Sequence, residues 1–454
     1  ADSIVTACAT GSSRSVAMSG VWVGLAFQAK MIEAWFVLPA LGVTYLVVSN
    51  RGIWTRILQL AGMAAIVVAV SLSWMVFVSL TPNTQRPYVD GSQNNSIIQQ
   101  VFDYNGFGRV GQPSPNELLG RTLDSSFLER PAPAASWDRL FSGFYGRDTG
   151  WLLPVSLLVI ALGLVALRRR KRADMLRAGI VLWGAWLIVF LIAFSVIGIN
   201  SYYLGALSPP IAALVGIGCE LALQNRDSLI PRFCVLGAVV VSTAYAYWLL
   251  PASGTGLPTW LQSVLLALGA SAALLLVTTL MYRVRRHLIA PLLVVSGLAI
   301  GIVPLVASVS VVTNDLGAFD TPFQSEQTTS FLKAFFSAPL DISSELPKLE
   351  SVRDGAPDLM ATQTSVLAAS FIFLTGQEVL PIGGYTGTIP APTVASLERM
   401  VAAGQFHLVI AGPYTTDPRI AWIAGHCIKL RTAVKNPGSP GVLPLRLYYC
   451  LARA

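Results

Sequence analysis

Long runs of apolar residues dominate the chain, and most of them match the length of a helix that crosses a membrane. A hydrocarbon core of about 30 Å takes roughly 20 apolar residues in helical form. Five runs reach that length, at residues 58–80, 178–199, 204–223, 260–282 and 288–312. Three slightly shorter runs join them, at residues 32–49, 151–167 and 234–250. The pattern therefore predicts eight membrane spans.

The basic residues cluster in every second connector between these runs. Arg and Lys cluster in residues 51–56, 168–177, 226–232 and 283–287. When the spans are laid end to end, these connectors fall on one side of the membrane, and Lys and Arg are enriched on the cytoplasmic side. We therefore predict that the long loop 81–150 and everything after Val312 lie outside the cytoplasm.

The first residues fit this order less well. Residues 4–9 are too short to span a membrane, and residues 16–29 are marginal in length. The start of the sequence shows neither the regions of a signal peptide nor an initiator Met. We expect that the chain begins inside a larger protein.

The composition changes after Val312, where charges return and the apolar segments shorten. Residues 330–336 and 393–403 have helical patterns, and residues 358–361 and 407–411 resemble short buried strands. Helices that alternate with short strands are typical of an α/β domain. The predicted fold is mainly α. It consists of a polytopic transmembrane helical bundle over 1–313, incomplete at its N-terminus, and a small extracytoplasmic α/β domain over 314–454.

A glycine-rich segment lies inside this predicted domain. Gly383, Gly384 and Gly387 surround Tyr385 and resemble a phosphate-binding loop. The segment GGYTG lacks both the lysine of a Walker motif and the spacing of a dinucleotide-binding motif. An ordinary turn is the other interpretation.

The overall composition supports a membrane protein. Hydrophobic residues make up 54% of the 454 residues and charged residues only 12%, which is too little charge for a soluble protein of this size. The net charge of +8 is spread over short clusters between apolar runs rather than gathered on one face. We therefore expect the lipid bilayer, and no nucleic acid, as a partner.

Cysteine and histidine are sparse. Five Cys occur without a CxxC pair and three His are scattered, so their spacing predicts no zinc site. Cys427 and Cys450 both fall in expected strands of the extracytoplasmic domain, where disulfides form. The sequence leaves open whether these two residues are bonded.

The loop 81–150 is rich in polar and aromatic side chains, and long ordered loops are often functional. Amide and phenol groups suit sugar hydroxyls, and guanidinium groups suit phosphate. The candidate binding residues of this loop are Arg86, Tyr88, Asn94, Asn95, Asn105 and Arg109. The other interpretation is a solvated loop held by its own turns.

Two further polar clusters lie at predicted membrane edges. Lys30 and Glu33 stand at the start of the first good span, and ionisable groups at membrane depth are costly unless they pair or face water. Three positions apart on one helix, they could simply neutralise each other. Tyr202 and Tyr203 form the second cluster, for which an aromatic belt is the alternative.

Several segments carry a family resemblance: GLAFQAKMIEAWFVLPALGVTYL, RPYVDGSQNNSIIQQVFDYNGFGR, INSYYLGALSPPIAALVG and MATQTSVLAASFIFLTGQEVLPIGGYTGTIPAPT. Together they resemble bacterial GT-C membrane glycosyltransferases of the protein O-mannosyltransferase and aminoarabinose transferase superfamily, which are glycosyltransferase family 39-like. The resemblance runs from about Gly20 to the end. It implies transfer of a hexose or pentose from a polyprenyl-phosphate sugar donor to an extracytoplasmic glycan, lipid or protein acceptor.

The chain departs from that family in its first part. The first outer loop of the fold supplies an acidic catalytic base, and this sequence does not contain that loop. Family members have a further Asp near the outer start of a later helix, which Asp2 matches, so the resemblance makes Asp2 the catalytic candidate. Asn200 stands where relatives commonly have His before the paired tyrosines, which leaves a divalent metal ion an open question and no cofactor certain. We expect a fragment or degenerate copy whose fold survives better than its activity.

Two other functions compete with a glycosyltransferase. A transporter or flippase predicts internal repeats and paired broken helices, and no duplicated pattern is evident. A membrane-anchored interaction module needs far fewer than eight spans. A glycosyltransferase is therefore the first hypothesis.

Overall fold

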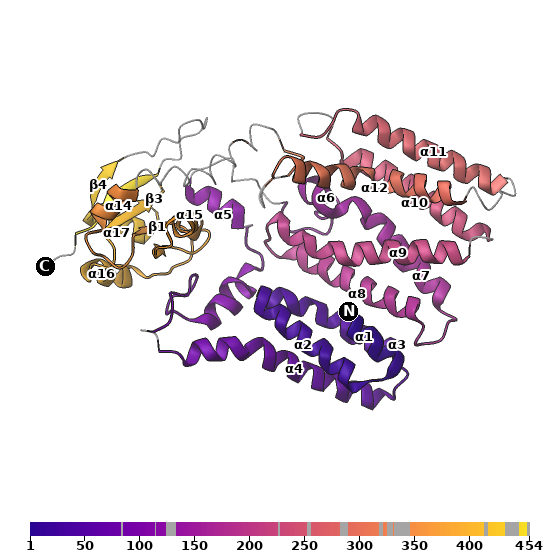
Figure 1. The fold of residues 1–454 in the computed structure, drawn as a ribbon, viewed down its shortest axis with the longest axis horizontal. Helices are drawn as coiled ribbons and strands as arrows, with labels where there is room; N and C mark the ends of the chain where they lie inside the picture. The colour runs from indigo at the N-terminus through magenta and orange to yellow at the C-terminus, as the bar shows by residue number, and fades with distance from the viewer. Residues whose placement is uncertain are drawn as a thin grey trace. The chain divides into compact units, whose positions relative to one another are not determined.

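The computed structural model describes residues 1–82, 85–113, 115–123, 133–225, 228–251, 256–281, 289–316, 321–324, 330, 346–412, 416–431 and 445–451. The chain divides into two compact units (Figure 1). The first consists of Ala1–Trp74, Ala135–Ile197 and Ser201–Ser325, and the second of Met75–Ala134, Gly198–Asn200 and Glu326–Ala454. Much of the predicted outer loop thus groups with the C-terminal segment, and the boundary at 313/314 stays a proposal.

Eight helical stretches within the described ranges are long and apolar enough to cross a membrane, which confirms the predicted polytopic helical fold. Each overlaps one of the eight predicted spans. They are Ser13–Val48, Ile53–Leu80, Gly143–Leu167, Met175–Val196, Ser201–Gln224, Leu229–Leu249, Leu261–Leu280 and Val294–Thr313.

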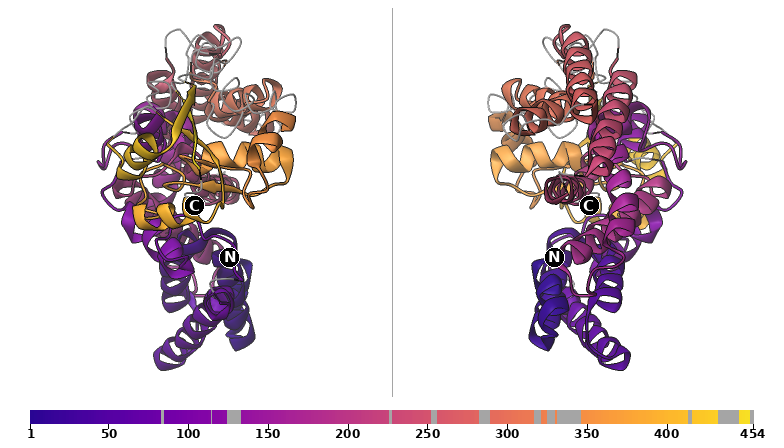
Figure 2. Two further views of the ribbon diagram at one scale, coloured as in Figure 1. Left: turned by 90° about the vertical axis from the view of Figure 1, so that its left-hand side faces the viewer. Right: turned by 90° about the vertical axis from the view of Figure 1, so that its right-hand side faces the viewer.

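Helices make up the first unit almost entirely. Figure 2 shows its N-terminal helices on one side and its last helices on the other, with α7–α9 between them. Its helices are α1 Asp2–Thr10, α2 Ser13–Lys30, η1 Met31–Val37, α3 Leu38–Val48, α4 Ile53–Leu80, α6 Gly143–Thr149, η4 Gly150–Leu152, α7 Leu153–Leu167, α8 Met175–Val196, η5 Ser201–Leu207, α9 Ser208–Gln224, α10 Leu229–Leu249, α11 Leu261–Met281 and α12 Ile289–Thr313. The last residues of α4 belong to the second unit.

The segment before the predicted first span is itself helical. Gly11 ends α1 in the left-handed conformation, with φ of 69°, and its N–H bonds to the Ala7 carbonyl. Ser12 then caps α2 by accepting a hydrogen bond from the Ser15 N–H. The too-short run 4–9 therefore becomes α1, a separate helix packed on its neighbours.

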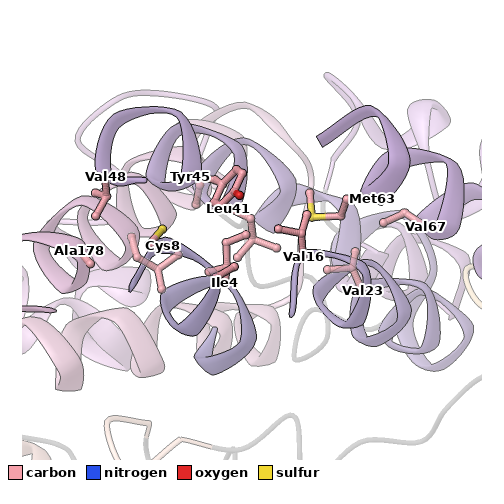
Figure 3. Close-up of a cluster of buried hydrophobic side chains, with 13 residues drawn as sticks. Ile4, Cys8, Val16, Val23, Leu41, Tyr45, Val48, Met63, Val67 and Ala178 are labelled. Atoms are coloured by element: carbon pink, nitrogen blue, oxygen red, sulfur yellow. The ribbon is translucent and has the colours of Figure 1, made fainter. Parts of the chain in front are cut away.

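A buried apolar cluster joins α1, α2, α3, α4 and α8 (Figure 3). Ile4 and Cys8 lie four positions apart, so both side chains of α1 face this cluster. Tyr45 of α3 is fully buried there, and its hydroxyl contacts the side chain of Gln59 on α4. Burial of this apolar face stabilises a helix that is too short to be stable alone.

The second unit contains a five-stranded sheet in the order β2-β1-β3-β5-β4. β1 pairs in parallel with β2 and β3, whereas β5 is antiparallel to β3 and β4. Its strands are β1 Met360–Thr362, β2 Val379–Pro381, β3 Leu408–Ala411, β4 Ile428–Arg431 and β5 Arg446–Tyr449. Its helices are η2 Gln99–Tyr104, η3 Phe107–Arg109, α5 Pro115–Leu123, α14 Leu346–Arg353, α15 Ser365–Thr375, α16 Val394–Ala402 and α17 Pro418–His426.

The two faces of this sheet are covered by different helices. Met360 of β1 joins an apolar cluster with Phe371 of α15. The next residue, Ala361, joins a cluster with Leu397 of α16 and Ile423 of α17. Because successive strand residues point to opposite faces, α15 covers one face and α16 and α17 cover the other. The predicted strands and the helix at 393–403 are confirmed, and the predicted helix at 330–336 lies outside the described residues except for Ser330.

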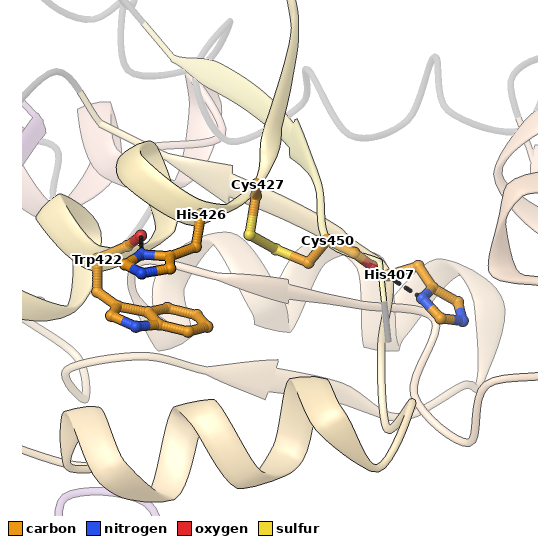
Figure 4. The surroundings of a disulfide bond; sticks show 5 residues. All are labelled: His407, Trp422, His426, Cys427 and Cys450. Carbon is orange, nitrogen blue, oxygen red and sulfur yellow. Dashed lines mark hydrogen bonds between the residues drawn. A yellow bond between two sulfur atoms is a disulfide. The ribbon is translucent and has the colours of Figure 1, made fainter. Parts of the chain in front are cut away.

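Cys427 and Cys450 form a disulfide, which answers the question that the sequence left open (Figure 4). Cys427 follows α17 and Cys450 follows β5, and their Cα atoms are 4.4 Å apart. The ring of His407 lies beyond Cys450, with Nδ1 3.0 Å from the Cys450 carbonyl oxygen. The bond ties the end of a helix to the end of a central strand.

Candidate functional site

The predicted site residues fall into two sets. Asp2, Lys30, Glu33, Tyr202 and Tyr203 belong to the first unit. The residues predicted from the outer loop belong to the second unit: Arg86, Tyr88, Asn94, Asn95, Asn105 and Arg109.

Asp2, Lys30 and Glu33 line one cavity of about 610 Å³ in the first unit. We call it the bundle cavity, and define it by Asp2, Trp22, Lys30, Glu33, Trp186 and Phe190. These residues come from α1, α2, η1 and α8. The cavity therefore gathers two carboxyl groups and one amine among apolar helices.

Lys30 and Glu33 do not share one helix, so that part of the prediction is wrong. The α-helix ends at Lys30, because Met31 adopts φ of 50° and ψ of −138°. The chain continues as the 3-10 helix η1, which contains Glu33. Both residues line the cavity although they lie on different helices, and their spacing in the sequence does not predict this arrangement.

The amine of Lys30 faces two aromatic rings. Its Nζ lies 4.2 Å from the ring centroid of Tyr203 and 5.6 Å from that of Tyr202. The two rings are themselves stacked, with centroids 4.7 Å apart. A cation within about 6 Å of an aromatic face is attracted by its negative face. The tyrosine rings thus hold the lysine, whereas substrate binding by them stays a prediction.

Two polar atoms of the cavity residues lack hydrogen-bond partners within the part of the chain that the structure describes. They are Oε2 of Glu33 and Nε1 of Trp186, and both are buried. A buried polar atom without a partner costs about 1–3 kcal/mol. Such atoms usually mark strain, function or an absent bonding partner. Here an acceptor and a donor are left available in the same cavity.

The bundle cavity has an aromatic wall that was not predicted from the sequence. Trp186 and Phe190 lie four positions apart on α8, and their stacked rings have centroids 6.0 Å apart. Trp22 of α2 also lines the cavity. The available signal is the four-residue spacing of aromatic side chains in the span 178–199, whose apolar character alone predicts only a membrane span.

Arg86 and Asn95 of the second unit are engaged within their own loop. Nε and Nη1 of Arg86 donate to the carbonyl oxygens of Thr81 and Asn95, at 3.0 and 2.9 Å. The side-chain oxygen of Asn95 accepts from the Val89 N–H. These bonds shape the turn, so the interpretation of a self-held loop describes them well.

The same holds for Asn105 and Arg109. Arg109 donates to the carbonyl of Tyr104 and to the Asn105 side-chain oxygen, both at 3.1 Å. The amide nitrogen of Asn105 donates to the Gln100 carbonyl. Asn94 is exposed. Substrate binding by these residues stays a prediction.

Tyr88 packs against the core of the α/β domain, and Asp90, which the sequence analysis overlooked, lies beside it. Burial raises the pKa of the Tyr88 phenol, the Asp90 charge raises it further, and Arg419 opposes them. Burial also raises the pKa of Asp90, against hydrogen bonds from the Ser365 side chain and the Gly91 backbone that lower it. Asp90 therefore lies close to the first turn of α15.

In the described ranges, no three or more His, Cys, Asp or Glu side chains gather in a group that could hold a metal ion. Asp2 and Glu33 are the two carboxyl groups of the bundle cavity.

Comparison with known proteins identifies relatives over most of the chain. Residues 346–426 match the family described as "Putative mannosyltransferase YkcB-like, C-terminal". "Putative mannosyltransferase YkcB" of Bacillus subtilis (strain 168) is 27% identical over 481 residues, which cover 86% of this chain and 66% of that protein. "Putative mannosyltransferase YycA" of the same organism is 25% identical over 488 residues, which cover 88% of this chain and 69% of that protein.

The chain thus spans about two thirds of the length of these curated relatives. No solved structure matches it. The matches confirm the predicted resemblance to bacterial mannosyltransferases.

Proposed function

We propose that this chain, a multi-pass membrane protein that resembles bacterial mannosyltransferases, is a glycosyltransferase. It transfers a sugar from a polyprenyl-phosphate donor to an extracytoplasmic glycan, lipid or protein acceptor. The observation that carries the proposal is the bundle cavity, where Lys30, Asp2 and Glu33 lie together among apolar helices. A lipid-linked phosphate sugar has an apolar tail and an anionic head, and both find complementary groups there.

The reaction exchanges one bond at the anomeric carbon for another. The acceptor oxygen forms a bond to that carbon, and the bond from the carbon to the phosphate oxygen breaks. The acceptor proton passes to a carboxylate, for which we assign Asp2, and polyprenyl phosphate leaves. Lys30 offsets the charge that grows on the leaving phosphate. The unpaired Glu33 oxygen accepts a hydrogen bond from a sugar hydroxyl of the donor, and the Trp186 N–H donates to a phosphate oxygen.

The basic connectors of the bundle support an extracytoplasmic position for this chemistry. Arg51 donates to the Gly11 carbonyl and Arg172 donates to the Val47 carbonyl. The basic connectors 51–56 and 168–177 therefore lie at the same end of the bundle. Lys30 stands at the opposite end of the 18-residue α2, about 25 Å away. If the basic end faces the cytoplasm, the bundle cavity opens toward the other side.

The disulfide supports the same orientation for the second unit. Cys427 and Cys450 are bonded, whereas Cys8, Cys219 and Cys234 are free. Disulfides persist in oxidising compartments and are rare in the cytosol. We therefore assign the C-terminal domain to the extracytoplasmic side.

The test uses membranes from cells that express the chain and a polyprenyl-phosphate mannose labelled in its sugar. We expect covalent transfer of the label to material outside the cytoplasm. Lys30→Met keeps the aliphatic stem and removes the charge, so we expect the transfer rate to fall about 10²- to 10³-fold. Lys171→Met changes a lysine of a basic connector and should leave the rate unchanged.

Two results would contradict the proposal. One is a transfer rate no higher than in membranes without the chain. The other is label that crosses the membrane without forming a covalent bond, which would favour a transporter.

A further inference from the structure

A second cavity, of about 520 Å³, lies in the second unit at the carboxyl end of the parallel strands. We call it the switch-point cavity. Its wall is formed by residues after β1, β2 and β3 and by two parts of the loop before residue 134. Its polar lining residues include Gln93, Gln363, Thr388, Thr416, Asp417 and Arg419.

The sheet topology explains why a cavity forms here. From β1 the chain passes through α15 to β2 on one side, and then through α16 to β3 on the other side of β1. The two helices cover opposite faces, so the connections diverge between β1 and β3. The side-chain oxygen of Gln363 accepts from the Gly412 N–H at 2.7 Å and joins the two strand ends. Open α/β sheets bind ligands at this divergence.

The nearby glycine-rich loop is not built to hold phosphate. A phosphate-binding loop offers free backbone N–H groups, but here the N–H groups of residues 383, 387 and 389 donate to protein carbonyls. The Tyr385 N–H donates to the Tyr104 hydroxyl at 3.1 Å, and the Thr388 N–H to the Thr386 hydroxyl at 3.4 Å. The loop's donors are therefore largely used within the protein.

The nearby helix ends and the buried Arg419 are also occupied by partners within the protein. Asp417 caps α17 by accepting from the Arg419 N–H, so a carboxylate already occupies that positive helix end. Asp90 stands close to the first turn of α15 in the same way. The Arg419 guanidinium is bound to Asp417 and to the carbonyls of Ile389 and Ala391. The buried cation is thus compensated.

Besides the guanidinium of Arg121, what remains on the wall is neutral and amphipathic. Gln93 and Thr416 are exposed and carry amide and hydroxyl groups. Pro390, Pro392 and Val394 supply apolar surface beside them. Amides and hydroxyls bond to sugar hydroxyls, and apolar surface packs on the C–H faces of a sugar ring. A cavity of this volume is in the range that holds small ligands.

We propose that the switch-point cavity binds a neutral oligosaccharide, so that the second unit holds a glycan acceptor. The role as acceptor rests on the proposed transferase activity, whereas binding itself does not. Gln93 and Thr416 bond to the sugar hydroxyls, and Gln363 keeps the two strand ends in place.

The test measures binding to the purified full chain in lipid nanodiscs by calorimetry. Mannotetraose and maltotetraose are the neutral probes, and inorganic phosphate and uridine diphosphate are the anionic probes. We expect at least one neutral probe to bind and neither anion to do so. Loss of one hydrogen bond in Gln93→Ala should weaken that binding about 5-fold. Thr416→Trp fills the cavity from an exposed position and should weaken it more than 10-fold.

Arg399→Ala alters an exposed face of α16 that does not line the cavity, and should leave binding unchanged. Binding of the anions instead, no binding of either neutral probe, or unchanged binding in Thr416→Trp would overturn the inference. Sugar transfer measured in parallel separates the two proposals. Transfer without oligosaccharide binding removes this inference alone, and binding without transfer removes the transferase alone.

Discussion

The bundle cavity and the candidate residues of the loop 81–150 both combine charged and aromatic side chains, but use them differently. In the bundle, Glu33 and Trp186 keep buried polar atoms without partners among the described residues. In the loop, Arg86 and Arg109 donate to backbone carbonyls and to a neighbouring amide. Polar groups that satisfy one another build a scaffold, whereas groups left unsatisfied at an energetic cost await a ligand. The hydrogen bonds therefore separate Glu33 and Trp186 from Arg86 and Arg109. In the second unit, Tyr88 Oη and Asp90 Oδ1 are likewise buried without partners among the described residues.

The cations show the same difference. Arg419 is buried, with 4% of its surface exposed, and is paired with Asp417. Lys30 is exposed to the bundle cavity, faces tyrosine rings, and has no ion pair in the described part of the chain. A buried compensated cation holds a fold together, whereas an accessible cation over aromatic rings can still meet an anion.

Removal of Arg419 should have the largest effect of any scaffold change. Arg419→Met removes the guanidinium that is bound to Asp417 and to two carbonyls, so we expect a loss of about 3–5 kcal/mol in the stability of the α/β domain. Hydrogen exchange of peptides from β1 and β3, measured by mass spectrometry, reports this stability. Protection equal to that of the unchanged chain would contradict a structural role for Arg419.

Removal of Arg86 should have a smaller effect, and it tests the loop directly. Arg86→Met leaves the Thr81 and Asn95 carbonyls without a charged donor, and we expect the loop to lose about 1–3 kcal/mol. The affinity for the polyprenyl-phosphate donor should change less than it does in Lys30→Met. If both variants lost the same affinity for the polyprenyl-phosphate donor, and hydrogen exchange of the loop did not change, Arg86 would be a binding residue rather than a structural one.

Asp358 lies between the fully bonded and the unbonded polar groups, because it is a buried carboxyl group with one side-chain hydrogen-bond donor. Gln405 donates to it at 3.1 Å, yet burial raises its pKa from 3.8 to about 6. Because the folded-state pKa is the higher one, the protonated group favours folding. Its contribution to stability is complete below pH 3.8 and is lost as the pH rises through about 6.

Asp358→Asn should therefore stabilise the α/β domain at pH 8 by about 1–2 kcal/mol and change it little at pH 4. The amide oxygen of Asn can still accept from Gln405, so the hydrogen bond is kept. Hydrogen exchange at the two pH values, corrected for intrinsic rates, measures the difference. A gain that is equal at both would show that Asp358 does not titrate as described.

The membrane spans could be predicted because their information is local. A run of some twenty apolar residues has few ways to satisfy its backbone except as a helix in lipid, and all eight predicted spans overlap helices of that kind. The strands at 358–361 and 407–411 were equally visible as short buried runs between polar segments. The break after Lys30 was not visible, because it depends on the positive φ of Met31.

Sequence alone determined which segments are helices or strands, which connectors are basic, and which polar residues are candidates for ligand binding. Only the tertiary structure decided which of those residues remain available. The partners of Arg86 and Arg419 are mostly carbonyls, which every residue carries and no sequence pattern marks. Packing likewise brought the ends of α17 and β5 together as a disulfide, and set the aromatic wall of α8 beside Lys30. Secondary structure follows from short-range periodicity, whereas a binding site depends on which groups the fold leaves unsatisfied.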